Sequence, residues 1–130
     1  MGTRCLLDTN TVIYYTKNDL PQNAVEFLDI QISKGVLLSV IFEIELLGWQ
    51  FPSVQTETIM QTFINDCMVA KLSRAIVLKT IEIRKLRKIK LPDAIIAATA
   101  LVHDLTLISR NDGYFKKIAG LKYLNPFTDL

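Results

Sequence analysis

The sequence contains few of the residues on which many enzyme active sites are built. Its 130 residues include one histidine and two cysteines. His103 lies near the end of a helical pattern beside Asp104, and no nucleophile motif accompanies it, which argues against a Ser/His/Asp or Cys/His mechanism. Cys5 and Cys67 lie among apolar residues without CxxC or Cys/His spacing. We therefore interpret them as core residues, not as a disulfide or a zinc site.

Long hydrophobic runs are also absent. No apolar stretch reaches the length of a membrane span, and no apolar leader precedes the first expected strand at Cys5. The chain has no repeats or linkers, and half of its residues are apolar, enough to form a real core. We expect residues 1–130 to form a single domain of a soluble cytoplasmic protein that does not associate with membranes.

The net charge is only +2, so the total charge does not indicate a nucleic-acid partner. Its distribution is uneven, because a basic run between positions 79 and 90 contains a single acid, Glu82. This run comprises Lys79, Arg84, Lys85, Arg87, Lys88 and Lys90. Such a run is typical of a solvated helix face and also of a surface that follows phosphates. Both interpretations remain open on this pattern alone.

Short apolar runs alternate with amphipathic segments along the chain. We expect strands at 5–7, 36–39, 67–70 and 105–108, with an edge strand at 121–124. The intervening helices include one with a buried stripe containing Ile59 and another whose inner face includes Leu86. A nearly all-apolar helix follows Asp93. This alternation predicts an α/β fold with three layers, α/β/α, around a central parallel sheet of four or five strands.

Four acidic positions occupy related places in this pattern. Asp8 follows the first strand, Asp112 follows a later one, Asp93 opens the apolar helix, and Glu45 lies in the helix after the second strand. Ligands of open parallel sheets bind beyond the carboxyl ends of the strands, where these acids would meet. Clustered carboxylates repel one another unless a cation joins them, and Mg²⁺ or Mn²⁺ prefers such oxygen ligands. The pattern is compatible with metal-assisted phosphodiester cleavage.

Each acid also has a simpler interpretation. Asp8 is a natural helix cap, Asp93 suits the positive end of a helix, and Asp112 begins a common turn pair. Glu43 and Glu45 lie about 200° apart around a helix, so at most one of them faces the site. Spacing alone leaves the cluster a possibility.

Four stretches resemble the PIN-domain ribonucleases, of the kind found as VapC toxins in VapBC toxin–antitoxin pairs. They are Leu6-Leu7-Asp8-Thr9-Asn10, Ser39 through Glu45-Leu46-Leu47-Gly48, Asp93 with the alanine-rich residues to Ala100, and Ser109-Arg110-Asn111-Asp112 with Phe115. They run in the family's order and span nearly the whole chain. Ser109 stands where the family usually has Thr.

The resemblance implies a PIN-like fold and an Mg²⁺- or Mn²⁺-dependent endoribonuclease that uses a metal-activated water. Its metal-binding and catalytic acids fall on Asp8, Glu45, Asp93 and Asp112, with Glu43 and Asn111 as rivals for the second and fourth positions. Asn10, Asn111 and Ser39 would orient the metal or the substrate. Arg84, Lys85, Arg87, Lys88 and Lys90 become candidate RNA contacts.

The same resemblance implies an RNA substrate, a small antitoxin partner and a homodimer. Trp49 and Phe51, near a loop, are consistent with such interfaces. Two other classes remain as alternatives. A receiver-like phosphoacceptor domain also gathers acids at strand ends, and a PIN-like module without catalysis would bind RNA or a partner. An early pair of adjacent acids, typical of receivers, is absent beside Asp8.

Overall fold

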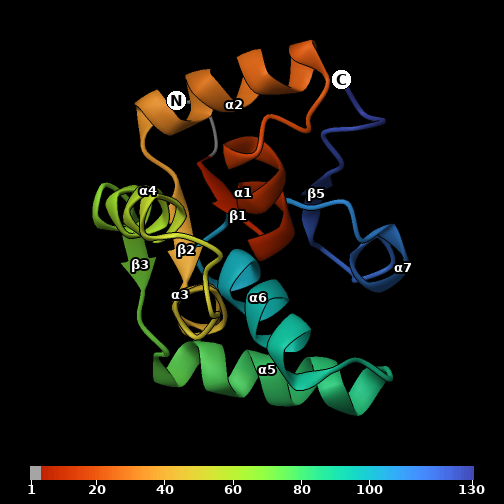
Figure 1. The fold of residues 1–130 in the computed structure, drawn as a ribbon. Helices are drawn as coiled ribbons and strands as arrows, with labels where there is room; N and C mark the ends of the chain where they lie inside the picture. Colours follow the sequence, from red (N-terminus) through yellow and green to blue (C-terminus); the bar gives the residue numbers. More distant parts are fainter. Residues whose placement is uncertain (1–3) are drawn as a thin grey trace.

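The computed structural model describes residues 4–130, so the start of the chain at 1–3, where we expect no leader, lies outside the described residues. Strands and helices alternate along the chain (Figure 1). The elements are β1 (Cys5–Leu7), α1 (Thr9–Thr16), α2 (Gln22–Lys34), β2 (Leu37–Ser39), α3 (Val40–Leu47), α4 (Val54–Asn65), β3 (Met68–Ala70), α5 (Arg74–Leu86), α6 (Leu91–Val102), β4 (Thr106–Ile108), α7 (Asp112–Phe115) and β5 (Lys122–Leu124).

The five strands form one parallel sheet in the order β3-β2-β1-β4-β5. Leu6 at the centre of β1 pairs with Leu37 of β2 on one side and Leu107 of β4 on the other. The predicted α/β class is therefore confirmed, with five strands. The receiver-like alternative is wrong, because folds of that type have the order 2-1-3-4-5 and this sheet places β3 outside β2.

The side chains of each strand alternate between the two faces of the sheet, so each face has its own core. Leu6, Leu37 and Leu107 belong to the core that α5 and α6 cover. The second core, on the opposite face, contains Leu7 and Leu38 together with residues of α1, α2, α3 and α4. Figure 1 shows the resulting three layers, with α2 and α5 at opposite ends of the view.

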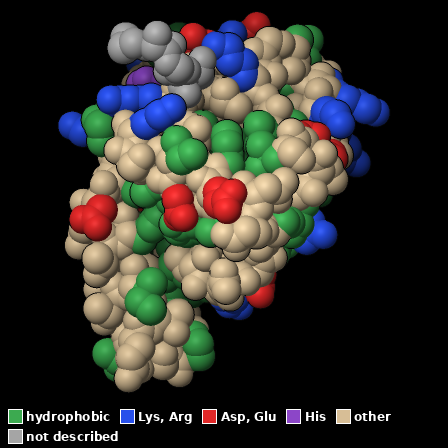
Figure 2. Space-filling view, turned by 90° about the horizontal axis from the view of Figure 1, so that it is seen from above, with side chains coloured by type: hydrophobic (Ala, Val, Ile, Leu, Met, Phe, Trp, Pro, Cys, Tyr) green, Lys and Arg blue, Asp and Glu red, His purple; other side chains and the backbone are tan. Residues whose placement is uncertain are grey.

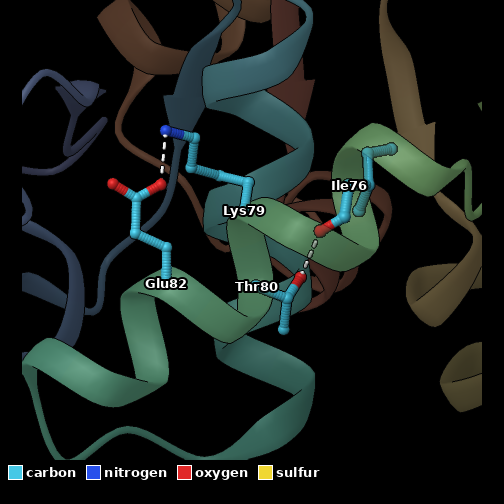
Figure 3. Close-up of polar contacts among 4 residues, drawn as sticks. All are labelled: Ile76, Lys79, Thr80 and Glu82. Atoms are coloured by element: carbon cyan, nitrogen blue, oxygen red, sulfur yellow. Dashed lines mark hydrogen bonds and ion pairs between the residues drawn. The ribbon is translucent and has the colours of Figure 1, made fainter.

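Helix α6 is buried on all sides, as its apolar sequence predicts. Every residue from 94 to 100 is buried, and four of them are alanines, which let neighbouring elements approach closely. Buried hydroxyls in this layer are satisfied within their own helices: Thr99 Oγ1 donates to the carbonyl of Ile95, and Thr80 Oγ1 donates to that of Ile76, both at 2.7 Å. Figure 3 shows the Thr80 bond in α5.

Two apolar residues differ from the expected stripes. Leu86 is 79% exposed, because it is the last residue of α5 and Arg87 continues in an extended conformation, so the buried stripe ends at Ile83. Ile59 is 55% exposed, whereas Met60 and Ile64, one helical turn apart, form the buried face of α4. Both predictions of burial were wrong at these positions.

The surface viewed from above Figure 1 intersperses charges of both signs with hydrophobic side chains (Figure 2). Lys and Arg side chains gather toward its margins, while acidic side chains remain in small separate groups. No helix within residues 4–130 combines the length and the apolar character needed to cross a membrane.

Candidate metal centre and active site

The candidate site lies where the connections of the sheet diverge. From β1 the chain proceeds outward to β2 and β3, and it returns to the other side of β1 with β4 and β5. Ligands of open α/β sheets bind beyond the carboxyl ends of the strands at such a switch point. A polar cavity of about 180 Å³ is found here, and it is lined by Asp8, Thr9, Asn10, Glu45, Trp49, Asp93 and Asn111.

Asp8 is the buried acid of this cavity, with 7% of its surface exposed. Its Oδ1 accepts a hydrogen bond from the backbone N–H of Thr9 at 2.8 Å, so it caps α1. Its Oδ2 accepts from the hydroxyl of Ser109 at 2.9 Å, just beyond the end of β4. The capping interpretation and the site interpretation of Asp8 therefore both apply, one through each carboxylate oxygen.

The cavity disfavours the charged forms of Asp8 and Asp93. Burial raises the pKa of Asp8 above its ordinary value of 3.8, the bonds from Ser109 and Thr9 oppose this rise, and the negative charges of Asp93 and Glu45 add to it. Burial also raises the pKa of Asp93, as does the charge of Glu45, while Lys90 acts in the opposite direction. The carboxylates of Asp8 (between β1 and α1), Glu45 (α3) and Asp93 (α6) thus lie within electrostatic reach of one another.

Helix α3 presents one of its two glutamates to the cavity. Glu45 lines it, and its Oε1 accepts a hydrogen bond from the hydroxyl of Thr9 at 3.1 Å. Glu43, in the first turn of α3, is half-buried and does not line the cavity. The side-chain cap of Ser39 on Ile41 N–H starts α3 directly at the end of β2, and this start sets the rotation of the helix.

The segment after β4 brings Asn111 to the cavity and Asp112 elsewhere. The backbone N–H of Asn111 donates to Ser109 Oγ at 3.0 Å, which links it to the hydroxyl that bonds Asp8. Asp112 does not line the cavity. Its Oδ1 accepts from the hydroxyl of Tyr123 at 2.6 Å and from Nδ2 of Asn125 at 3.2 Å, and these bonds lower the pKa of Asp112.

The remaining predicted residues occupy three different settings. Asn10 is exposed and lines the cavity, whereas Ser39 is buried as the cap of α3. Arg84 and Lys85 lie in the last turn of α5, and Arg87, Lys88 and Lys90 lie beyond it, so the run does not share one helix face. Arg87 Nη2 donates to the carbonyl of Lys117 at 2.9 Å.

Only part of the basic run is close to the acids. Lys90 is the residue that precedes α6, three positions before Asp93, and its charge acts on the Asp93 carboxylate. At the other end of the run, Lys79 Nζ forms an ion pair with Glu82 at 2.8 Å on α5 (Figure 3). Lys90 is therefore the basic side chain with the most direct electrostatic link to the cavity.

The donor set of the cavity matches the preferences of a hard divalent cation. Three carboxylates and the amide oxygens of Asn10 and Asn111 are ligands that suit Mg²⁺ or Mn²⁺. Within residues 4–130, Asp, Glu, His and Cys side chains do not form a group of three or more already close enough to share one ion. Mutual repulsion keeps these acids apart in the absence of an ion. The types of residue therefore suit a divalent cation, although the carboxylates are not already spaced as its ligands.

Comparison with known proteins identifies the family of the chain. Residues 5–121 match the family model described as the PIN domain. The chain belongs to the PIN domain family. The match covers the stretches from β1 to the segment before β5, so it includes every residue that lines the acidic cavity. The sequence-based recognition is confirmed at this level.

Several solved structures resemble the chain over nearly its whole length. The chain is 26% identical to a chain of a toxin–antitoxin complex from Klebsiella pneumoniae, with a TM-score of 0.74, covering 95% of this chain and 98% of that one. It is 28% identical to a chain of FitAcB from Neisseria gonorrhoeae, with a TM-score of 0.73 and coverage of 95% and 99%. DNA-bound VapBC from Salmonella typhimurium has a TM-score of 0.81 at 24% identity, with coverage of 96% and 99%. No curated protein matches the chain.

Three side chains at the site of this PIN domain were not assigned to the site from the sequence. Thr9 bonds Glu45, Ser109 bonds Asp8, and Trp49 lines the cavity. Thr9 lies in the Asp-Thr-Asn stretch and Ser109 lies in the Ser-Arg-Asn stretch, so the motifs mark their neighbourhood. Their partners are 36 and 101 positions away, and only the folded chain brings each pair together.

Proposed function

We propose that residues 1–130 act as a single PIN-like domain that is an Mg²⁺- or Mn²⁺-dependent endoribonuclease, the toxin of a type II toxin–antitoxin pair. The observation that supports it best is the convergence of Asp8, Glu45 and Asp93 in one cavity at the carboxyl end of a parallel sheet. Their mutual repulsion disfavours the metal-free state and favours a bound dication. The PIN family match and the toxin–antitoxin neighbours support the same assignment.

The bound ion would activate a water and neutralise charge that develops on the scissile phosphate. Asp8, Glu45 and Asp93 would hold it. The Ser109 hydroxyl donates to Asp8 Oδ2, and the Thr9 hydroxyl donates to Glu45 Oε1, so each of these carboxylates has one oxygen held by a hydrogen bond. Such supporting bonds orient metal ligands and tune their basicity.

The amides near the acids are suited to a neutral role. Asn10 and Asn111 line the cavity, and their N–H₂ groups would donate to phosphate oxygens, which carboxylates cannot do. At the fourth position the geometry favours Asn111. The role of Asp112 in metal binding stays a prediction, because its carboxylate is already engaged by Tyr123 and Asn125. Ser39 would act through the start of α3 that it caps.

The basic residues would attract the RNA backbone toward this cavity. The charge of Lys90 acts directly on Asp93. Arg84, Lys85 and Lys88 precede it in the chain and are exposed. Arg87 is half-buried and bonded to Lys117, so we expect a smaller contribution from it. Each lost phosphate contact should reduce the slope of log K against log salt concentration by about one, so this slope measures how many of these residues contact phosphates.

Antitoxin binding and homodimer formation belong to the same proposal. Large apolar side chains of α3 and the start of α4 remain exposed, among them Ile44 at 63%, Leu47 at 40% and Val54 at 76%. Exposed apolar residues that cluster on neighbouring elements are typical of protein interfaces. The solved toxin–antitoxin complexes show that related chains have protein partners. Sedimentation analysis of the purified chain alone and with a co-expressed small partner tests both associations.

The central experiment uses the two glutamates of α3 as a matched pair. Glu45→Gln and Glu43→Gln make the same chemical change two residues apart, and only Glu45 lines the cavity. We expect Glu45→Gln to reduce Mg²⁺-dependent cleavage of single-stranded RNA at least about 100-fold, and Glu43→Gln to leave it within a few fold. EDTA should stop the wild type. Circular dichroism of both variants confirms that each is folded.

The same assay separates the remaining candidates. Asp8→Asn and Asp93→Asn should abolish cleavage. Asn111→Ala should reduce it about 10- to 100-fold, whereas Asp112→Asn should change it little if Asn111 provides the fourth group. An RNA affinity that survives EDTA and Asp8→Asn, without cleavage in any condition, would identify a binding module and contradict the nuclease proposal.

A further inference from the structure

Trp49 occupies the boundary between the acidic cavity and a second, apolar cavity. The second cavity, of about 190 Å³, lies between α1, α4 and the connection that joins α3 to α4, with Ile13, Phe51 and Pro52 among its walls. Trp49 lines both cavities and keeps 48% of its surface exposed. Its ring lies 6.5 Å from that of Phe51, at 55°. A large aromatic surface is therefore available beside the carboxylates.

The chain holds Trp49 in this place by a tight turn. Helix α3 ends at Leu47, and the N–H of the capping residue Gly48 donates to the carbonyl of Ile44. A Cβ at position 48 would lie 2.8 Å from the carbonyl oxygen of Ile44, which is too close for a Cβ atom, so this position favours glycine. Trp49 N–H then bonds the carbonyl of Leu46 at 3.2 Å. The backbone of Trp49 is thus fixed to the helix that also carries Glu45.

We propose that Trp49 is a stacking platform for one base of a single-stranded RNA, with the adjoining phosphate in the acidic cavity. This inference rests on the proposed nuclease function and deepens it, because it names a side chain that selects an unpaired substrate. Base stacking on an aromatic ring accepts any base but requires the base to be free of a duplex. Trp49 therefore favours single strands and loops without reading a sequence.

The surroundings of Trp49 favour a nucleotide as the occupant. Trp49 lines a cavity whose donor set suits a dication and hence a phosphate, and it also lines a second cavity that offers apolar walls for a base. Lys17, an exposed cation, lines the apolar cavity and is available to the next phosphate along the strand. A base with a phosphate on either side of it is the unit of a nucleic-acid strand, and the two cavities offer groups for each part.

Trp49 is the only tryptophan in the sequence, so its emission reports directly on this position. The Asp93→Asn variant retains Trp49 and is not expected to cleave, so it can be titrated with RNA in Mg²⁺. We expect a single-stranded RNA hexamer to quench the emission, and a blunt RNA duplex or inorganic triphosphate to leave it unchanged. This signal does not depend on cleavage.

Variants of the same side chain measure its contribution. Trp49→Ala in the wild-type background should raise KM for single-stranded RNA about 5- to 150-fold with a kcat within a few fold, since stacking acts before chemistry. Trp49→Phe should restore most of the affinity and guards against a folding defect. Tyr114→Ala is the matched control, because Tyr114 is another exposed aromatic residue that lines neither cavity.

The outcomes separate this inference from the proposed function. RNA cleavage with no quenching and an unchanged KM in Trp49→Ala would overturn the stacking role and leave the nuclease intact. Quenching by single-stranded RNA in a chain that never cleaves would support stacking and overturn the nuclease. Unchanged emission with every RNA would overturn the inference and leave this surface to a protein partner.

Discussion

Removing the hydroxyl of Ser109 tests the site most directly, because this hydroxyl donates a hydrogen bond to the buried carboxylate of Asp8. Ser109 is fully buried, donates to Asp8 Oδ2 at 2.9 Å and accepts from the N–H of Asn111 at 3.0 Å. Ser109→Ala removes both bonds without adding volume. A hydrogen bond to a charged group contributes about 1.5–3 kcal/mol, so we expect the free energy of unfolding to fall by about that amount once Asp8 is ionised. For a chain of this size that corresponds to a drop in Tm of roughly 5–12 °C.

The pH dependence of this loss identifies its cause. Ser109 lowers the pKa of Asp8, so in Ser109→Ala the folded-state pKa of Asp8 is higher than in the wild type. Between these two folded-state values the variant retains a proton that the wild type has released, and the stability of the wild type relative to the variant grows with pH. Below the lower of the two pKa values, Asp8 is protonated in both proteins and the difference in their stability is smallest. Above the higher pKa value, the difference in stability no longer changes with pH.

The assay is chemical denaturation of both metal-free proteins at a series of pH values above and below the ordinary carboxyl pKa of 3.8. Ser73→Ala serves as the control, because Ser73 caps α5 through a backbone N–H and bonds no carboxylate, so its cost should not vary with pH. A Ser109→Ala loss that is equally independent of pH would refute the link between this hydroxyl and the charge of Asp8.

Three further outcomes follow from the same geometry. The raised pKa of Asp8 means that the metal-free wild type loses stability as the pH rises above 3.8, whereas an asparagine at this position does not ionise. Asp8→Asn should therefore gain stability relative to the metal-free wild type as the pH increases, as measured by denaturant midpoints. A relative loss of stability would contradict this prediction. Thr9→Val should weaken Mg²⁺ binding about 10-fold by calorimetry, since it removes the bond to Glu45, whereas Thr56→Val, on α4, should not. Tyr123→Phe should move the pKa of Asp112 up toward its ordinary value in a carboxyl NMR titration while RNA cleavage stays within a few fold, and a large loss of cleavage would return Asp112 to the site.

The fold was largely readable from local patterns. Apolar runs such as 5–7 and the alanine-rich segment after Asp93 are so uniformly apolar that only burial on all sides accommodates them. Exceptions occur where a pattern passes the end of its element, as at Leu86, or lies at the margin of a stripe, as at Ile59. Periodicity defines a face, but it does not define how far the neighbouring element covers that face.

The sequence by itself determined the class of fold, the family and the acids that belong to its motifs, because these follow from residue types and their order. Only the tertiary structure decided which glutamate of α3 and which residue after β4 lines the cavity. The rotation of α3 depends on its start at Ser39, and the path of Asn111 and Asp112 depends on Tyr123 and Asn125. The partnership of Asp8 with Ser109 likewise exists only because parallel pairing brings the ends of β1 and β4 together across 101 positions.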